Sequence, residues 1–317
     1  MSSASTPQSP EIPPTRSVVR PTTWIEAPRL ERRLGVRLIL ASETFQHTGS
    51  FKFRAAYNVA SQVPQRHIIT ASSGNFGQAL AHACSRLHKT CAVVMPHTSA
   101  AVKVAAVREY GGIVDLVDVT RKSRAERVAE LAAERPDAYV ASAYDDPLVI
   151  AGNATLGEEV AARPGAFDVV VAPVGGGGLT AGLVTGIAAS GRQLAVVGAE
   201  PLLGNDAARS LRAGTLVRNE REPATIADGA RTVSLGQHNW QVLARGLREI
   251  VEVPEEAIRE AVRLLFGLAN LKVEPTGALS VAALLAAPER FSGQSVCCVV
   301  SGGNVDPAVY REILAEG

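Results

Sequence analysis

The sequence has little of what marks several common classes of protein. Its 317 residues include only four cysteines, Cys84, Cys91, Cys297 and Cys298, and no CxxC spacing. The adjacent pair lies in the apolar run 295–300, where we expect a buried strand. This pattern argues against a disulfide framework and a zinc site, and it predicts a protein of the reducing cytoplasm.

An excess of charge of either sign is also absent. There are 32 basic and 31 acidic residues, for a net charge of +1, and no long block of Lys and Arg. We therefore expect no nucleic-acid partner. One uncharged run, 169–190, is long enough to cross a membrane. A proline and four glycines interrupt it, so it predicts a soluble strand, loop and helix instead.

What the chain does have is a regular alternation of strands and helices. Expected strands are 36–41, 67–71, 90–94, 113–117, 168–172, 193–199 and 295–300. Expected helices, after a turn and short helix in 22–34, are 50–62, 75–87, 99–110, 121–134, 150–162 and 180–189. Such alternation predicts parallel sheets, and the length and 46% hydrophobic content suit about two α/β domains with a ligand cleft between them.

The domain boundaries follow from the same pattern. Residues 1–15 are rich in Ser and Pro and lack the basic start and apolar core of a signal peptide, so we expect a disordered arm. We expect a large domain formed by 16–66 and 145–317. The intervening segment 67–144 is expected to form a small, mobile domain.

Lys52 stands in the stretch 48–54, between two phenylalanines and after a Gly-Ser turn. This context predicts partial burial, which lowers a lysine pKa toward the neutral, nucleophilic amine. A neutral lysine amine can form a Schiff base with an aldehyde cofactor. Ser50 is expected to cap the helix that begins here. The alternative is a lysine whose stem merely covers apolar surface.

Two loops between a strand and a helix predict anion binding. In the turn 72–77, Ser-Ser-Gly-Asn-Phe-Gly, free N–H groups and hydroxyls suit a carboxylate, although an ordinary helix cap explains the turn equally well. In Pro173–Thr180, four consecutive glycines suggest a phosphate cradled by backbone N–H groups. Residues 176–181 also fit the dinucleotide pattern GxGxxA, with Glu200 as the ribose-binding acid.

Three later motifs complete the set. Glu200 and Asp206 are two carboxylates that suit a hard divalent cation, or alternatively Asp206 caps a helix and Glu200 is solvated. The segment Glu274-Pro275-Thr276-Gly277 opens a helix. Ser301 heads Ser-Gly-Gly-Asn at the end of the last strand, where its hydroxyl would face the cleft.

Together these motifs resemble the serine/threonine dehydratase and serine racemase family of fold type II pyridoxal-phosphate (PLP) enzymes, which are tryptophan synthase beta-like. The resemblance rests on residues 43–52, 72–75, the tetraglycine loop, 274–277 and 301–304. It implies that Lys52 binds the PLP aldehyde and that Asn75 bonds its 3-oxygen. It further implies that Ser301 bonds the pyridine nitrogen, and that Gly175, Gly176, Gly177 and Gly178 bind the phosphate. Phe51 and Glu274 complete the implied cofactor site.

The resemblance also implies a substrate site and a metal site. Ser72, Ser73, Gly74, Asn75 and Phe76 would hold the substrate, with Ser73 on the cofactor face opposite Lys52. Glu200, the Gly204 carbonyl and Asp206 would bind Mg²⁺ or Ca²⁺. The chain departs from the family's common pattern at Phe76, where histidine is frequent, and at 55–57, which puts the substrate choice in doubt.

The implied chemistry is a β-elimination in which the freed Lys52 amine removes the Cα proton of L-threonine or L-serine, giving a 2-oxo acid and ammonia. A racemase activity, on serine or aspartate, and dehydration of hydroxyaspartate or phenylserine are the nearest alternatives. A nicotinamide-dependent oxidoreductase and a non-catalytic binding module are more distant ones. The family implies a homodimer.

Overall fold

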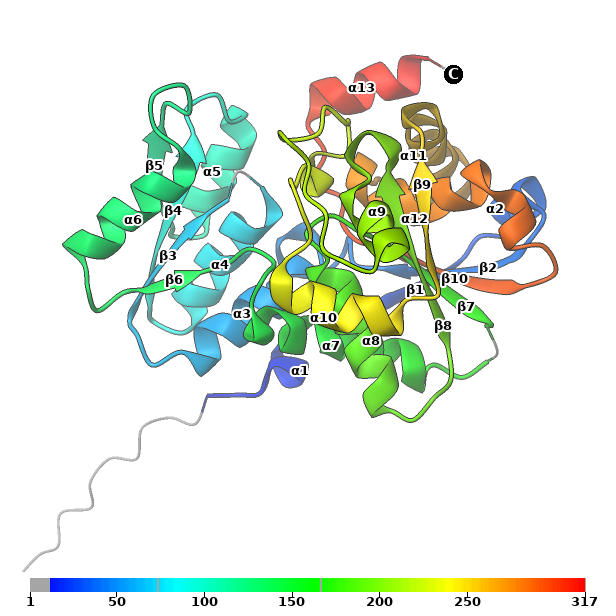
Figure 1. Ribbon diagram of the computed structural model, residues 1–317, viewed down its shortest axis with the longest axis horizontal. Coiled ribbons are helices and arrows are strands. Elements are labelled where there is room, and N and C mark those ends of the chain that lie inside the picture. Colours follow the sequence, from blue (N-terminus) through cyan, green and yellow to red (C-terminus); the bar gives the residue numbers. More distant parts are fainter. Residues whose placement is uncertain (1–11, 73, 166, 317) are drawn as a thin grey trace, which may run out of the picture.

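A computed structural model describes residues 12–72, 74–165 and 167–316, which form two lobes with one sheet each (Figure 1). The large lobe is built on a six-stranded sheet, in the order β1 (Thr23–Glu26), β2 (Arg37–Ser42), β10 (Ser295–Val300), β7 (Val169–Pro173), β8 (Ala195–Pro201) and β9 (Glu249–Val253). The small lobe is built on a four-stranded sheet, in the order β5 (Ile113–Val117), β4 (Thr90–Pro96), β3 (His67–Ala71) and β6 (Tyr139–Ala141).

Neighbouring strands are parallel in both sheets, except that β1 pairs with β2 in the antiparallel sense. The central strands β7 and β10 are almost entirely buried, which explains why they are continuous apolar runs rather than alternating ones. The parallel α/β architecture predicted from the sequence is therefore confirmed.

Helices cover both sheets (Figure 1). In the small lobe they are α4 (Asn75–Arg86), α5 (Ala101–Glu109) and α6 (Arg124–Glu134). In the large lobe they are α1 (Thr15–Val18), α2 (Pro28–Leu34), α7 (Pro147–Ala162), α8 (Gly178–Ala189), α9 (Asp206–Ala213), α10 (Gln237–Gly246), α11 (Glu255–Ala269), α12 (Pro275–Ala286) and α13 (Pro307–Ala315). Between the lobes, α3 (Lys52–Gln62) packs against both α7 and α4. Short 3-10 turns are η1 (His47–Gly49), η2 (Leu202–Gly204), η3 (Asp228–Ala230) and η4 (Pro288–Arg290).

Every strand expected from the sequence is present to within two residues at each end, but β1, β6 and β9 were missed. All three lie at the edge of a sheet, and β1 and β6 have only four and three residues, which is too short for an apolar run or an alternation to stand out. The run 169–190 forms β7, the glycine loop and α8, and within the described residues no helix is long and apolar enough to cross a membrane.

The prediction that Ser50 caps α3 is wrong. Its backbone is extended, with φ of −160°, and it forms an isolated antiparallel bridge with Gly302. Phe51 instead precedes the helix, and its N–H donates to the Ser301 carbonyl at 2.9 Å. The first residue of α3 is Lys52, so the expected position of the lysine at a helix N-terminus is confirmed. The domain boundaries and the mobility of 67–144 stay predictions, as does the disorder of the arm, although α1 begins at its last residue.

The start of α3 is anchored by Arg54, which is completely buried. Its guanidinium donates to Glu43 of the loop after β2 at 2.7 and 2.9 Å, and to Glu159 of α7 at 2.8 Å. It also donates to the hydroxyls of Thr22 and Thr155, both at 3.0 Å. Burial alone would lower the pKa of Arg54, but the two carboxylates outweigh it and raise the pKa above its usual value.

We expect Arg54→Met to lower the free energy of unfolding by about 3–5 kcal/mol, because it leaves the buried carboxylate of Glu43 and the partly buried one of Glu159 without their partner. The matched control is Arg16→Met, which removes an exposed pair with Glu158 and should cost no more than about 1 kcal/mol. Urea unfolding of the cofactor-free proteins measures both. Equal losses in the two variants would contradict the prediction.

Candidate functional site

Lys52 is enclosed by aromatic rings at the junction of the lobes. Its ammonium lies 5.1 Å from the centre of the Phe51 ring and 5.7 Å from that of Phe76, and it donates to the Ala143 carbonyl at 2.7 Å. The second ring expected from the sequence was Phe53, but Phe53 is buried in the core instead. Desolvation lowers the pKa of Lys52 to about 8, against the opposing charge of Glu274. A substantial neutral fraction is therefore available near physiological pH, as a nucleophile or base requires.

Two side chains join the lobes beside this lysine. The Asn75 amide, at the first residue of α4, donates to Glu274 at 2.7 Å across the gap between the lobes. Asn304 donates to the Asn75 side-chain oxygen at 2.8 Å and to the Thr48 carbonyl at 2.7 Å. Burial and the charge of Asp228 raise the pKa of Glu274 to about 7. The predicted residues Lys52, Asn75 and Glu274 are thus brought together.

The tetraglycine loop links β7 to the N-terminus of α8. Gly177 has φ of +91°, in the left-handed region that favours glycine, and no side chain caps α8. A side chain on Gly176 would collide with the ring of Tyr144, and one on Gly175 would lie 2.9 Å from the backbone of Ala230. The loop therefore has uncapped N–H groups and no room for side chains at these glycines. Free backbone N–H groups at a helix N-terminus suit a phosphate.

Three buried hydroxyls, in the segment just before Lys52 and at the end of β10, have no hydrogen-bond partner within the described part of the chain. These are Ser301 Oγ, Ser50 Oγ and Thr48 Oγ1. Ser301 follows β10, and its carbonyl accepts from the N–H of Phe51, next to Lys52. A buried hydroxyl without a partner is costly unless a ligand satisfies it. A desolvated lysine amine, a loop of uncapped N–H groups and a neutral hydroxyl donor together fit PLP.

The predicted carboxylate-binding turn is described only in part, since Ser73 lies outside the described residues. The Ser72 hydroxyl accepts from the Gly77 N–H at 3.0 Å, so this serine satisfies a free N–H in the first turn of α4 from two residues before the N-cap Gly74. That observation supports the ordinary helix-cap interpretation for Ser72 itself. Gly74 has open space around its Cα, and Phe76 is buried with its ring toward Lys52.

Glu200 and Asp206 are both buried, so the alternative of a solvated Glu200 is wrong. Glu200, and not Asp206, satisfies the start of α9, because it accepts from the N–H groups of Ala207 and Ala208 at 2.9 and 2.8 Å. Burial and the neighbouring Asp206 raise the pKa of Glu200. Each oxygen of Glu200 thus accepts one N–H group at the start of α9 and keeps a second lone pair for a further partner.

Asp206 keeps one oxygen, Oδ2, without a partner among the described residues, and the other accepts from Asn219 at 2.9 Å. Burial raises the pKa of Asp206 to about 6. Two buried carboxylates and the Gly204 carbonyl are hard oxygen donors that suit Mg²⁺ or Ca²⁺. However, no group of three or more His, Cys, Asp or Glu side chains suited to a metal occurs in the chain as described.

Three contributors to this site were missed from the sequence. Tyr144 covers Gly176, and Asn239 of α10 donates to the carbonyls of Tyr144 and Gly176 at 3.0 and 2.6 Å. Asn304 was recognised only as part of a motif and not as the residue that holds Asn75. Tyr144 and Asn239 lie outside any motif, so only the spatial arrangement reveals their roles.

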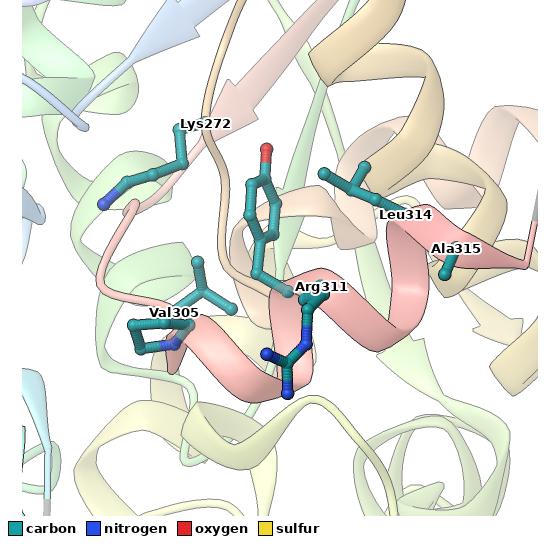
Figure 2. Close-up of a pocket in the computed structure, with 7 residues that line it drawn as sticks. Lys272, Val305, Arg311, Leu314 and Ala315 are labelled. Atoms are coloured by element: carbon teal, nitrogen blue, oxygen red, sulfur yellow. The ribbon is translucent and has the colours of Figure 1, made fainter.

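Two pockets on the large lobe lie away from the site around Lys52. One, of about 530 Å³, lies along α13, with Lys272 from the segment before α12 and Arg311 from α13 in its lining (Figure 2). Another, of about 630 Å³, is lined by residues of the segment 218–224 together with Leu203 and Arg209. Neither contains a residue of the predicted cofactor or substrate site.

Comparison with known proteins agrees with this geometry. Residues 15–302 match the family model described as pyridoxal-phosphate dependent enzyme. The chain is 36% identical to an L-threo-3-hydroxyaspartate ammonia-lyase from Pseudomonas sp, over 90% of each chain. It is 34% identical to a serine racemase from Schizosaccharomyces pombe, over 86% of this chain and 85% of the relative.

A solved structure shows the same fold. The crystal structure of T.th. threonine deaminase is 41% identical and superposes with a TM-score of 0.86, over 92% of this chain and 94% of that one. The family match, the relatives and the shared fold agree with the lysine, glycine loop and serine found here. The chain therefore belongs to the serine/threonine dehydratase and serine racemase family of fold type II PLP enzymes.

Proposed function

We propose that this protein is an ammonia-lyase that converts a 3-hydroxy amino acid, L-threonine or L-serine, into a 2-oxo acid and ammonia. The observation that carries the proposal is Lys52, whose amine has a lowered pKa and is held at the junction of the lobes. PLP, when bound, supplies an acceptor for the electron pair left at Cα. Lys52 is the group that holds the cofactor aldehyde and takes the Cα proton.

The surrounding residues support this assignment. Ser301 would offer a neutral hydroxyl to the pyridine nitrogen, and a hydroxyl does not favour protonation of that nitrogen as a carboxylate would. The tetraglycine loop would hold the phosphate, and Asn75 would position the ring through the contact it already makes with Glu274. Phe51 and Phe76 exclude water from the amine of Lys52, which keeps its basicity low.

Dehydration of 3-hydroxyaspartate is the second candidate, because the Pseudomonas relative carries that name. A second substrate carboxylate needs a cation. Lys103 lies close enough to Glu274 to lower its pKa, but it is already paired with Asp228. This pairing favours a substrate with one carboxylate. The homodimer, the cytoplasmic location and the side racemase activity remain predictions.

Lys52→Ala should abolish turnover and leave a folded protein, because it removes the base and the covalent anchor without deleting a large core group. Borohydride treatment of the wild type should add the mass of reduced PLP to the Lys52 peptide. Loss of a general base typically costs about 10²-fold or more, so activity above roughly a hundredth of wild type would contradict the assignment. Lys122→Ala, at an exposed surface pair, is the control.

We also propose that Glu200, the Gly204 carbonyl and Asp206 bind Mg²⁺ or Ca²⁺, supported by the unpartnered Asp206 oxygen. Chelation should lower both the melting temperature and the activity. Metal at 100 times its dissociation constant should restore about 2.7 kcal/mol of stability. Asp206→Ala should be insensitive to both treatments, whereas the exposed-site control Asp118→Ala should respond as wild type. A wild type unaffected by exhaustive chelation would refute the site.

For Ser73 we propose the role of proton donor on the cofactor face opposite Lys52. Ser73→Ala should abolish racemisation and turnover of D-serine while much of the L-dehydratase activity is retained. Solvent deuterium at Cα, followed with both enantiomers of serine and threonine, measures this. Ser72→Ala is the neighbouring control and should weaken all activities together, because Ser72 caps α4. Equal loss of every activity in Ser73→Ala would contradict the role.

A further inference from the structure

A partly shielded ion pair crosses between the lobes outside the site described above. Lys103, on α5 of the small lobe, pairs with Asp228, at the start of η3 in the large lobe. The Lys103 side chain is only 24% exposed and that of Asp228 is 40% exposed. Pairs that are partly shielded from water contribute more than fully exposed ones.

Asp228, the member of the pair in the large lobe, lies in a turn that contacts α12 and the tetraglycine loop. The Gly229 N–H donates to the Thr276 hydroxyl at 2.9 Å, two residues after Glu274. Ala230 packs directly against Gly175 of the tetraglycine loop. The carboxylate of Asp228 is therefore held in place relative to both Glu274 and the phosphate cradle.

The small-lobe partner is connected to the predicted substrate turn. Helix α5 packs against α4, whose first residue is Asn75 and which follows the turn 72–74. The two members of the pair also act on the same carboxyl group. After burial, the charge of Asp228 raises the pKa of Glu274, whereas Lys103 lowers it. The ion pair therefore lies beside the Asn75–Glu274 contact and joins the same two lobes.

We propose that Lys103 and Asp228 are positioning residues that hold the small lobe closed over the substrate, and that neither binds the substrate itself. The expected change in KM assumes the ammonia-lyase activity proposed above. If only the closed form binds substrate productively, breaking the pair reduces the closed fraction, and the apparent affinity for every amino acid falls by the same factor. Arg124 and Glu222 form a second pair between the lobes at 2.8 Å, but Glu222 is 58% exposed.

The kinetic experiment compares Lys103→Met, Asp228→Asn and the charge exchange Lys103→Asp with Asp228→Lys. Each single variant should raise KM about threefold to fivefold for both L-serine and L-threonine, with kcat little changed. The exchanged pair should recover part of that loss. The control is Lys122→Met, because Lys122 pairs with Glu130 inside the small lobe and should leave KM unchanged. Loss confined to L-threo-3-hydroxyaspartate would overturn the proposal, because Lys103 would then be a substrate ligand.

A second measurement does not depend on activity. The four native cysteines are buried, so spin labels can be directed to Val119→Cys in the small lobe and Phe266→Cys in the large lobe, whose native side chains are 45% and 50% exposed. Without substrate, Lys103→Met should broaden the distance distribution between the labels, whereas Lys122→Met should not. Identical distributions in both would overturn the proposal. If the wild type has no ammonia-lyase activity but Lys103→Met still broadens the distance distribution, the proposed function is refuted. The role of the ion pair in holding the lobes closed is then supported.

Discussion

The position of the lysine-bearing helix depends on one buried charge. Arg54 lies two residues after Lys52 and has no exposure to water, so its guanidinium must be satisfied by protein groups alone. Those groups come from the loop after β2, from α7 and from the segment before β1. Any displacement of the start of α3 would break several of these bonds together. The amine of Lys52 therefore projects from a fixed point, as its proposed roles toward the cofactor aldehyde and the Cα proton require.

Helix α7 carries this constraint to the tetraglycine loop. A side chain on Gly152 would lie 2.6 Å from the Arg54 carbonyl, so α3 and α7 touch through their backbones. On the other face of α7, a side chain on Gly157 would lie 2.6 Å from the Leu183 carbonyl of α8. Because two close backbone contacts leave little room for sliding, α7 sets the separation between the helix that begins with Lys52 and the helix that follows the tetraglycine loop.

Much of this arrangement could be predicted from the sequence because its signals are local. The parallel sheets follow from apolar runs, and the loop between β7 and α8 follows from four glycines between a strand and a helix. What could not be predicted depends on contacts distant in the sequence. The ring facing Lys52 is that of Phe76 rather than Phe53, and Glu200 caps α9 because β8 delivers its carboxylate to that helix. Tyr144 and Asn239 act on Gly176 from other segments, so no local pattern identifies them.

The two sides of the junction between the lobes differ in chemistry. On the α3 side, Phe53 and Tyr57 share one continuous apolar core with Leu80 and Val93 of the small lobe. On the other side the contacts are polar, as between Asn75 and Glu274. Separating apolar surfaces costs about 25 cal/mol per Å², whereas a hydrogen bond exchanged for water costs only about 1 kcal/mol net. The least costly relative motion of the lobes therefore keeps the α3 side packed and opens the polar side, where the predicted substrate turn lies.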